Sequence, residues 1–196
     1  MTETQTTPIA TTIGAPDITG GYVLDVAHSR LGFVARHAMV TKVRGAFNDF
    51  EGTAHLDGTD PSKSYATVTI DVASVDTRQS QRDDHLRTND FFDAPTYPKI
   101  TFVSTAVEKL DAESFRMTGD LTIKDVTKSV SIDFDYNGSA TDPYGNQRVG
   151  FEGSTVINRK DFGVNFNAAL EAGGVMVSEK ITLEFEISAI KTPPAA

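Results

Sequence analysis

Apolar and polar residues alternate along most of the chain with a period of two, the pattern of half-buried β-strands. The clearest example covers residues 29–37, where one face carries Ser29, Leu31, Phe33, Ala35 and His37. The same alternation returns in residues 65–72, 100–106, 115–123, 130–136 and 181–189. Strands with one apolar and one polar face are typical of antiparallel sheets. The pattern therefore predicts an all-β fold.

The apolar faces of these strands provide a candidate interior. The large residues that could line it are Leu31, Phe33, Val68, Ile70, Phe102, Leu121, Ile132, Phe134, Leu183 and Phe185. Small residues on the same faces would leave room between them, namely Ala35, Ala66, Ser104, Ala106 and Gly119. Protein interiors normally pack as densely as organic crystals. The alternation alone is thus compatible with either a packed core or an open lumen.

Turn residues separate the strands at Asp57-Gly58, Asp60-Pro61, Asn137-Gly138 and Asp142-Pro143-Tyr144-Gly145. Two stretches depart from the β pattern. Residues 39–43 suit one short helical turn, and residues 77–90 suit a charged surface helix with Ser80 as its cap. About eight long strands with little helix allow either a two-sheet sandwich or a closed antiparallel barrel that encloses side chains or one small ligand.

The length of 196 residues fits one domain. Residues 1–20 are rich in Thr, Ala, Pro and Gly and predict a flexible tail, followed by a barrel domain over 21–191 and a short tail over 192–196. The N-terminal segment has no Lys or Arg and no apolar core, so it does not read as a signal peptide. We therefore expect a cytoplasmic protein.

Composition excludes several classes of function. The net charge of −9, with a sequence pI of about 4.8, disfavours binding to nucleic acid. No apolar run is long enough for stable membrane insertion. Without cysteine there is no disulfide framework and no thiolate metal site.

Catalytic and metal-binding signals are weak. The chain lacks a Gly-x-Ser-x-Gly elbow, a phosphate-binding glycine loop and a dinucleotide fingerprint. The histidines, together with Asp83 and Asp84, do not show a recognised zinc spacing. We therefore expect no catalytic residues, no metal and no cofactor.

Several motifs, in the same order along the chain, resemble the YceI-like family. They begin with Tyr22-Val23-Leu24-Asp25 and His28-Ser29 and continue through residues 45–52. The most specific part is Arg82-Asp83-Asp84-His85-Leu86-Arg87 with Asp90-Phe91-Phe92-Asp93 and residues 97–102. Residues 119–127 and Arg159-Lys160-Asp161-Phe162-Gly163 complete the match, which spans roughly residues 21–190. The resemblance implies an extended, lipocalin-like barrel with an apolar tunnel.

For function, the resemblance implies non-catalytic binding, transport or storage of a long-chain amphiphilic lipid in that tunnel. A polyisoprenoid, such as a polyprenyl phosphate or an isoprenoid quinone, is the expected ligand and could co-purify with the protein. Its head would lie near the mouth, close to His37, His85 and basic residues that include Arg159, and Phe92 would join the lining. Members of the family are commonly dimeric, so a homodimer is expected.

Alternatives remain open for these residues and for the whole chain. Arg82, Asp83 and His85 suit a salt-bridged helix cap as well as a ligand site, and an ion pair between Arg159 and Asp161 could simply stabilise a turn. A packed barrel could serve as a protein-interaction or stress-response module. An enzyme acting on an isoprenoid is the third hypothesis.

Overall fold

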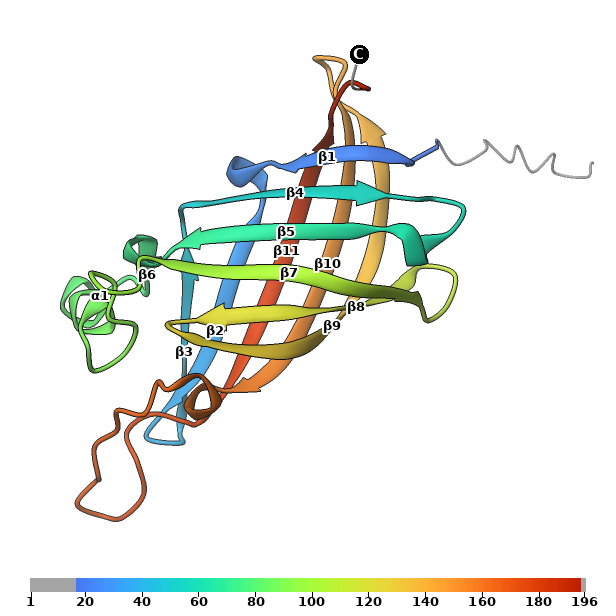
Figure 1. Cartoon of the computed structure of the whole chain (residues 1–196). Helices are drawn as coiled ribbons and strands as arrows, with labels where there is room; N and C mark the ends of the chain where they lie inside the picture. The colour runs from blue at the N-terminus through green and yellow to red at the C-terminus, as the bar shows by residue number, and fades with distance from the viewer. Residues whose placement is uncertain (1–16, 195–196) are drawn as a thin grey trace, which may run out of the picture.

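The computed structural model describes residues 17–194, and a closed antiparallel barrel of eight strands forms its centre. In order around the barrel, these strands are β1 (Gly20–Leu24), β4 (Phe50–Leu56), β5 (Tyr65–Asp71), β7 (Lys99–Lys109), β8 (Ser114–Ile123), β9 (Val126–Thr141), β10 (Gln147–Asn158) and β11 (Lys180–Lys191). Pairing of β1 with β11 closes the barrel. In Figure 1, β4, β5 and β7 cross in front of β11 at a steep angle. The predicted all-β barrel is confirmed.

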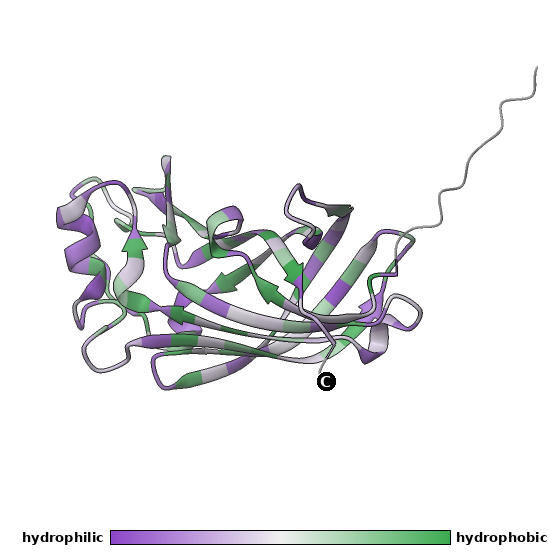
Figure 2. Cartoon of the chain, turned by 90° about the horizontal axis from the view of Figure 1, so that it is seen from above, coloured by the Kyte–Doolittle hydropathy of each residue, from purple (hydrophilic) through white to green (hydrophobic). Residues whose placement is uncertain are grey.

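Three more strands extend one end of the barrel. The N-terminal half of β11 pairs with β2 (Arg30–His37), which pairs with β3 (Thr41–Phe47), and β3 pairs with the short β6 (Val75–Asp76). The 3-10 turn η1 (Val26–His28) separates β1 from β2, so the two strands share β11 as a partner. Figure 2 shows hydrophobic and hydrophilic residues alternating along the strands. The side chains that line the barrel interior are mostly apolar.

The long connection between β5 and β7 carries the predicted helix. After η3 (Val72–Ser74) and β6, α1 runs from Ser80 to Arg87. Gln79 is its cap, because the Gln79 side chain accepts a hydrogen bond from the Arg82 amide. The prediction of Ser80 as the cap is therefore wrong by one residue. The remaining 3-10 turns are η2 (Pro61–Lys63) and η4 (Arg159–Phe162).

The predicted helical turn over residues 39–43 is wrong. Residues 38–40 are the tip of a hairpin, and β3 already begins at Thr41, opposite His37. Ala38 and Met39 both adopt left-handed backbone conformations, with φ of 50° and 58°. Such conformations reverse the chain in a tight hairpin and do not continue a helix.

Two further strand details differ from the prediction. Asn137-Gly138 is not a turn, because β9 runs through to Thr141 and the chain reverses at Asp142–Gly145. Gly138, at φ +112°, instead forms an irregularity where the β9–β10 register shifts. A second shift, between Ser104 and Ala106, places Val107 inside the barrel and leaves Ala106 exposed.

The chain ends are closer to the barrel than the predicted tails suggest. Residues 1–16 of the expected N-terminal tail and residues 195–196 lie outside the described residues. Ile18 packs against the cluster around Tyr22, and β1 already begins at Gly20. At the other end, the Thr192 amide donates to the Gly21 carbonyl at 2.8 Å.

Buried residues gather at the two ends of the barrel. One cluster comprises Phe47, Val72, Val75, Phe91, Ile100, Leu121, Ile123, Phe162 and Val164. The other comprises Tyr22, Val149 and Ala189. Between these clusters the inward-facing Phe102, Phe134 and Phe185 are only half-buried. Large apolar side chains that face inward and still reach solvent indicate an interior that is not close-packed.

Candidate ligand-binding cavity

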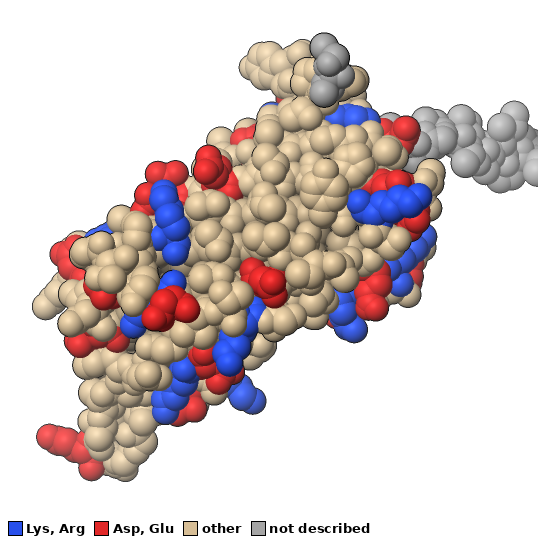
Figure 3. All heavy atoms as spheres, in the orientation of Figure 1, with Lys and Arg blue, Asp and Glu red and all other residues tan. Residues whose placement is uncertain are grey.

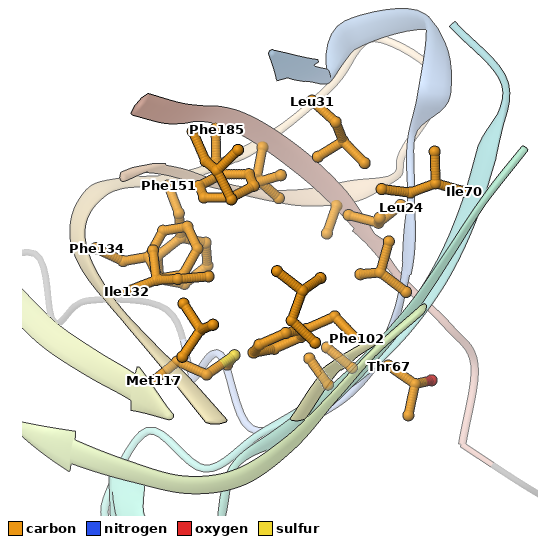
Figure 4. Close-up of a pocket in the computed structure, with 18 of the residues that line it drawn as sticks. Leu24, Leu31, Thr67, Ile70, Phe102, Met117, Ile132, Phe134, Phe151 and Phe185 are labelled. Atoms are coloured by element: carbon orange, nitrogen blue, oxygen red, sulfur yellow. The ribbon is translucent and has the colours of Figure 1, made fainter. Parts of the chain in front are cut away.

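A cavity of about 750 Å³ occupies the barrel interior. Aliphatic, aromatic and thioether side chains from all eight barrel strands and from β2 and β3 line it (Figure 4), among them Leu24, Leu31, Ile70, Phe102, Met117, Ile132, Phe134, Phe151 and Phe185. This volume lies in the range of about 300–1,000 Å³ that is usual for small-molecule sites. The wall is almost wholly apolar, so the cavity suits a hydrocarbon chain.

Glycines on neighbouring strands let the aromatic rings lie against the wall. A Cβ at Gly119 would stand 2.4 Å from Phe102 Cζ, and a Cβ at Gly45 would stand 2.3 Å from Phe33 Cζ. These distances are too short for any side chain other than hydrogen. The rings therefore cover the glycines instead of crossing the lumen, and the lumen stays open.

One end of the cavity reaches the protein surface. Its lining there includes residues of the β4–β5 connection and the β7–β8 hairpin that are themselves exposed, namely Gly58, Thr59, Lys109 and Ala112. In Figure 1 both connections lie at the same end of the barrel, on the right. We define this end as the mouth.

Tyr22 is the most deeply buried polar residue near the mouth, at 1% exposure. Its hydroxyl donates to the Ile18 carbonyl at 2.8 Å. Burial, with smaller contributions from Tyr136 and Asp17, raises the pKa of Tyr22 to about 12. The phenol is thus held neutral in the wall of the cavity.

The opposite end of the cavity is closed. Phe91, Phe162 and Val164 are buried there and line it, with the half-buried Leu86 and Phe92 beside them. The helical connection supplies Leu86, Phe91 and Phe92, whereas η4 and the residues after it supply Phe162 and Val164. We define this region as the closed end.

Arg159 is the charged residue in the wall of the closed end, and it is only 5% exposed. Its Nε donates to the Ser178 carbonyl at 2.9 Å, and its Nη1 donates to the Val164 carbonyl at 2.6 Å. Its Nη2 has no hydrogen-bond partner among the residues that the structure describes. Burial lowers the pKa of the guanidinium, and the charge of Glu179 opposes this shift.

The alternative of an ion pair between Arg159 and Asp161 is wrong. Within residues 17–194, no carboxylate lies within ion-pair distance of Arg159, and Asp161 is exposed. The neighbouring Lys160 instead pairs with Glu179 at 2.5 Å. Arg159 stabilises the turn through backbone carbonyls, and its Nη2 is without a partner among the described residues.

Most of the residues predicted for the site line the cavity. They are Leu31, Phe33, Ala35, Val68, Ile70, Phe92, Phe102, Leu121, Ile132, Phe134, Arg159, Leu183 and Phe185. Of the predicted small neighbours, Ala35 and Ala66 line it, whereas Ser104, Ala106 and Gly119 do not. A role for these residues in contacting a ligand stays a prediction.

His37 and His85 do not line the cavity, which corrects their placement beside a head group. His37 is exposed near the end of the β2–β3 hairpin, where its backbone bridges to Val177. The apolar alternation of β2 therefore ends before His37. His85 lies outside the barrel wall, where its Nε2 is 2.8 Å from Asp90 Oδ2 and its ring contacts the edges of Phe91 and Phe166.

The structure favours a structural role for the charged motif, although Arg82 and Asp83 form hydrogen bonds to Thr77 and not the predicted salt bridges, and Gln79 is the helix cap. Asp83 is buried and accepts hydrogen bonds from both the amide and the hydroxyl of Thr77. Arg82 donates from Nε to the Thr77 hydroxyl at 2.7 Å. These bonds fasten α1 to the end of β6, and they leave Arg82 and Asp83 away from the lumen.

Sequence reasoning missed the contribution of β10 to the cavity. Val149, Phe151 and Ile157 line the lumen from this strand. The signal was available, because Val149, Phe151, Gly153, Thr155 and Ile157 alternate with polar or exposed positions. The two glycines in this segment weaken the apolar pattern.

Neither a metal site nor, on the face drawn in Figure 3, a patch of a single charge is found among the described residues. Among residues 17–194, no group of three or more His, Asp or Glu side chains could hold a metal ion. Lys and Arg are intermingled with Asp and Glu on the face shown in Figure 3. Within the described part of the chain, no helix is long and apolar enough to cross a bilayer.

A family model described as the YceI-like domain matches residues 22–189. The chain belongs to the YceI-like domain family. Curated relatives of this YceI-like chain include UPF0312 proteins from Staphylococcus aureus. The protein from strain MSSA476 is 41% identical over 169 residues, which cover 86% of this chain and 95% of the relative.

Solved structures share the fold of this YceI-like chain. BcnA of Burkholderia cenocepacia superposes with a TM-score of 0.75 at 28% identity, covering 84% of this chain and 98% of BcnA. The YCEI protein of Campylobacter jejuni gives 0.70 at 33% identity, covering 81% and 90%. A polyisoprenoid binding domain from Saccharophagus degradans gives 0.65 at 17% identity, covering 87% and 98%. At that identity, the likeness shows the fold alone.

Proposed function

We propose that this chain binds a long-chain amphiphilic lipid non-covalently and carries or stores it. The observation that carries the proposal is the apolar cavity of about 750 Å³ inside a closed barrel. Burial of a hydrocarbon tail contributes roughly 0.8 kcal/mol per CH₂ group before ordering costs. A tail of about ten carbons would therefore gain roughly 8 kcal/mol, which is comparable with the cost of association, so longer tails are favoured.

A polyisoprenoid is the proposed tail. The Saccharophagus degradans domain, which shares the barrel fold, is described as polyisoprenoid-binding. Branched isoprene units also suit a wall that contains both flat rings, such as Phe102 and Phe134, and small residues, such as Ala35 and Ala66. The cavity disfavours the packed-barrel hypothesis, since a close-packed core would leave no space of this size.

Native mass spectrometry of the purified protein, followed by organic extraction, is the direct test. We expect one lipid per chain, either retained through purification or taken up from a panel of polyprenyl phosphates and isoprenoid quinones. Protein that carries no lipid and takes up none from the panel would contradict the proposal. The same spectra report subunit number and so test the expected homodimer.

A variant that fills the cavity separates tail burial from surface adsorption. Ala66 lines the lumen from β5, and Ala66→Phe would place a ring inside it. Thr69 lies on the same strand outside the cavity lining, so Thr69→Phe is the matched control. We expect Ala66→Phe to lower uptake of long chains more than uptake of short ones, and Thr69→Phe to leave both unchanged. Equal effects of the two variants would point to binding outside the barrel.

A further inference from the structure

The closed end of the cavity contains an unsatisfied donor where the rest of the wall is apolar. Arg159 is 5% exposed and lines the cavity, yet its Nη2 has no hydrogen-bond partner in the described part of the chain. Buried polar groups are nearly always hydrogen-bonded, and each exception requires an explanation. Arginine stays protonated in proteins, so the unpaired group also carries charge.

The surroundings of Arg159 do not neutralise this charge by direct contact. Its bonded partners are the carbonyls of Ser178 and Val164, which are neutral. Glu179 is the carboxylate whose charge acts on Arg159, but its own ion pair is with Lys160. A buried charge without a close counter-charge is costly, and one anionic oxygen from a ligand would remove that cost.

We infer that Arg159 holds the head group of the ligand through an anionic oxygen, so that the amphiphile enters the barrel head first. The inference rests on the proposed lipid-binding function and adds the charge of the head and its orientation. The tail then extends along the lumen past Phe134 and Phe185 toward the mouth at Lys109 and Ala112. A chain longer than the lumen would emerge there, where the lining is exposed.

Access to Nη2 requires a local rearrangement, because neighbouring atoms cover it. Phe92 and Phe166, which pack against the buried cluster at the same end of the barrel, are only half-buried. Charge-assisted hydrogen bonds to a guanidinium are short and about twice as strong as neutral ones. Such a bond provides the free energy for opening this end.

Three probes test the inference on the full chain: geranylgeranyl phosphate, geranylgeraniol with the same tail, and inorganic phosphate. For the unaltered protein, we expect the phosphate ester to bind about tenfold to a hundredfold more tightly than the alcohol. Inorganic phosphate should bind far more weakly than the ester, because it has no tail to bury. Tight binding of inorganic phosphate would instead indicate a free-anion site and overturn the lipid-head assignment.

Single-residue variants test where in the barrel the lipid head group binds. Arg159→Gln should abolish the preference for the ester while leaving binding of the alcohol nearly unchanged. Lys160→Gln is the matched control, since Lys160 is the adjacent cation and lies outside the cavity lining. A preference that survives Arg159→Gln, or that is lost in Lys109→Gln, would overturn the orientation and place the head at the mouth.

A measurement on the unaltered protein covers the case in which Arg159→Gln does not fold. In NMR spectra, the ester and the alcohol should differ in their effects on the Arg159 Nε–H and the Val164 methyl groups, and not on the methyl groups of Val107 near the mouth. Differences confined to Val107 would overturn the inference. Binding of neither probe would contradict the proposed function itself, whereas equal binding of both would contradict only the anionic head.

Discussion

The ring of Phe134 lies directly over Gly153 of the neighbouring strand, where a Cβ would stand 2.5 Å from Phe134 Cδ1. Gly153 also pairs with Phe185 on its other side, and the two rings lie 5.9 Å apart between centroids. Glycine weakens a strand interior unless another group approaches it closely. Here the close approach is the ring, which lies along the wall and leaves the lumen free.

Gly153→Ala should therefore both destabilise the barrel and narrow the cavity. The Asp133 carbonyl would also lie 2.8 Å from the new Cβ, so the backbone cannot easily yield, and the ring of Phe134 must swing into the lumen. We expect a loss of about 1–3 kcal/mol in the free energy of unfolding. Urea denaturation measures this loss, and lipid titration should show reduced uptake of long chains.

Gly150→Ala is the matched control on the same strand. A Cβ at Gly150 would meet its nearest atoms at 3.7 and 3.9 Å, which are ordinary contact distances. We expect a change within about 0.5 kcal/mol. If Gly153→Ala proves no more destabilising than Gly150→Ala, the position of the Phe134 ring does not depend on a glycine at residue 153.

The strand faces could be predicted from the sequence because period-two alternation survives wherever one face is buried. Leu183 and Phe185 on β11, like Ile132 and Phe134 on β9, lie inside the barrel as predicted. The prediction failed where a bulge changed the phase, at residues 104–106, because one inserted residue moves every later side chain to the other face.

The alternating pattern could not predict that the interior is open or that a site lies at its closed end. A packed core and an open lumen carry the same pattern, and the difference depends on pairs such as Phe134 and Gly153 that meet only across strands. His37 was placed inside because the apolar face of β2 was continued to the last residue of the strand, where the side chain is exposed. The role of Arg159 toward carbonyls also depends on contacts with residues that follow it by five and nineteen positions.

Arg148 on β10 bonds to two carboxylates, one on Asp25 just after β1 and one on Asp142 just after β9. Its Nε donates to Asp142 at 2.8 Å, and its Nη1 bonds to Asp25; the side chains of Asp25 and Asp142 are 12% and 11% exposed. The Arg148 guanidinium lowers the pKa of Asp25 below the usual value of 3.8. The Asn146 side chain, followed by Arg148, lowers the pKa of Asp142 below the same value. A carboxyl group with a lowered folded-state pKa stabilises the protein above its unfolded pKa and loses that contribution as pH falls.

We therefore expect the stability of the unaltered protein to fall below about pH 4, and Arg148→Met to reduce both the stability at pH 7 and its acid dependence. Thermal unfolding between pH 2 and pH 7 measures this. Arg116→Met is the control, because Arg116 and Asp133 form an exposed pair that contributes little. If Arg148→Met loses stability at low pH in the same way as the unaltered protein, other carboxyl groups cause that loss.

Tyr22 should cause a loss of stability at high pH, whereas the two carboxyl groups cause a loss at low pH. Its pKa is raised from 10 to about 12 in the folded state, so the folded protein holds the proton more tightly than the unfolded chain does. The resulting stability is complete below pH 10 and is lost as pH rises toward 12. Tyr22→Phe should flatten this decline, and at pH 7 it should lose about 1 kcal/mol with the bond to the Ile18 carbonyl.

Urea denaturation at pH 7, 10 and 11 compares Tyr22→Phe with Tyr144→Phe. Tyr144 is 89% exposed at the β9–β10 turn, so its replacement should leave both the stability and the alkaline decline unchanged. Parallel declines in all three proteins would mean that lysines or other tyrosines cause the alkaline loss.

Asp83 fastens the helix that closes the barrel, and its removal should loosen that end. The amide and hydroxyl of Thr77, which is 4% exposed, both donate to Asp83, which is 6% exposed. Asp83→Ala leaves these two donors buried and unpaired, with an expected loss of about 1–3 kcal/mol or more in the free energy of unfolding. Asp84→Ala is the control, because the Asp84 side chain is 76% exposed.

Hydrogen exchange should show that the loss of Asp83 acts locally. The amides of α1 and Phe91 should lose protection first, since these residues close the cavity through the contacts that Asp83 holds in place. Equal stability of the two variants would show that apolar packing of Phe91 alone holds the helix.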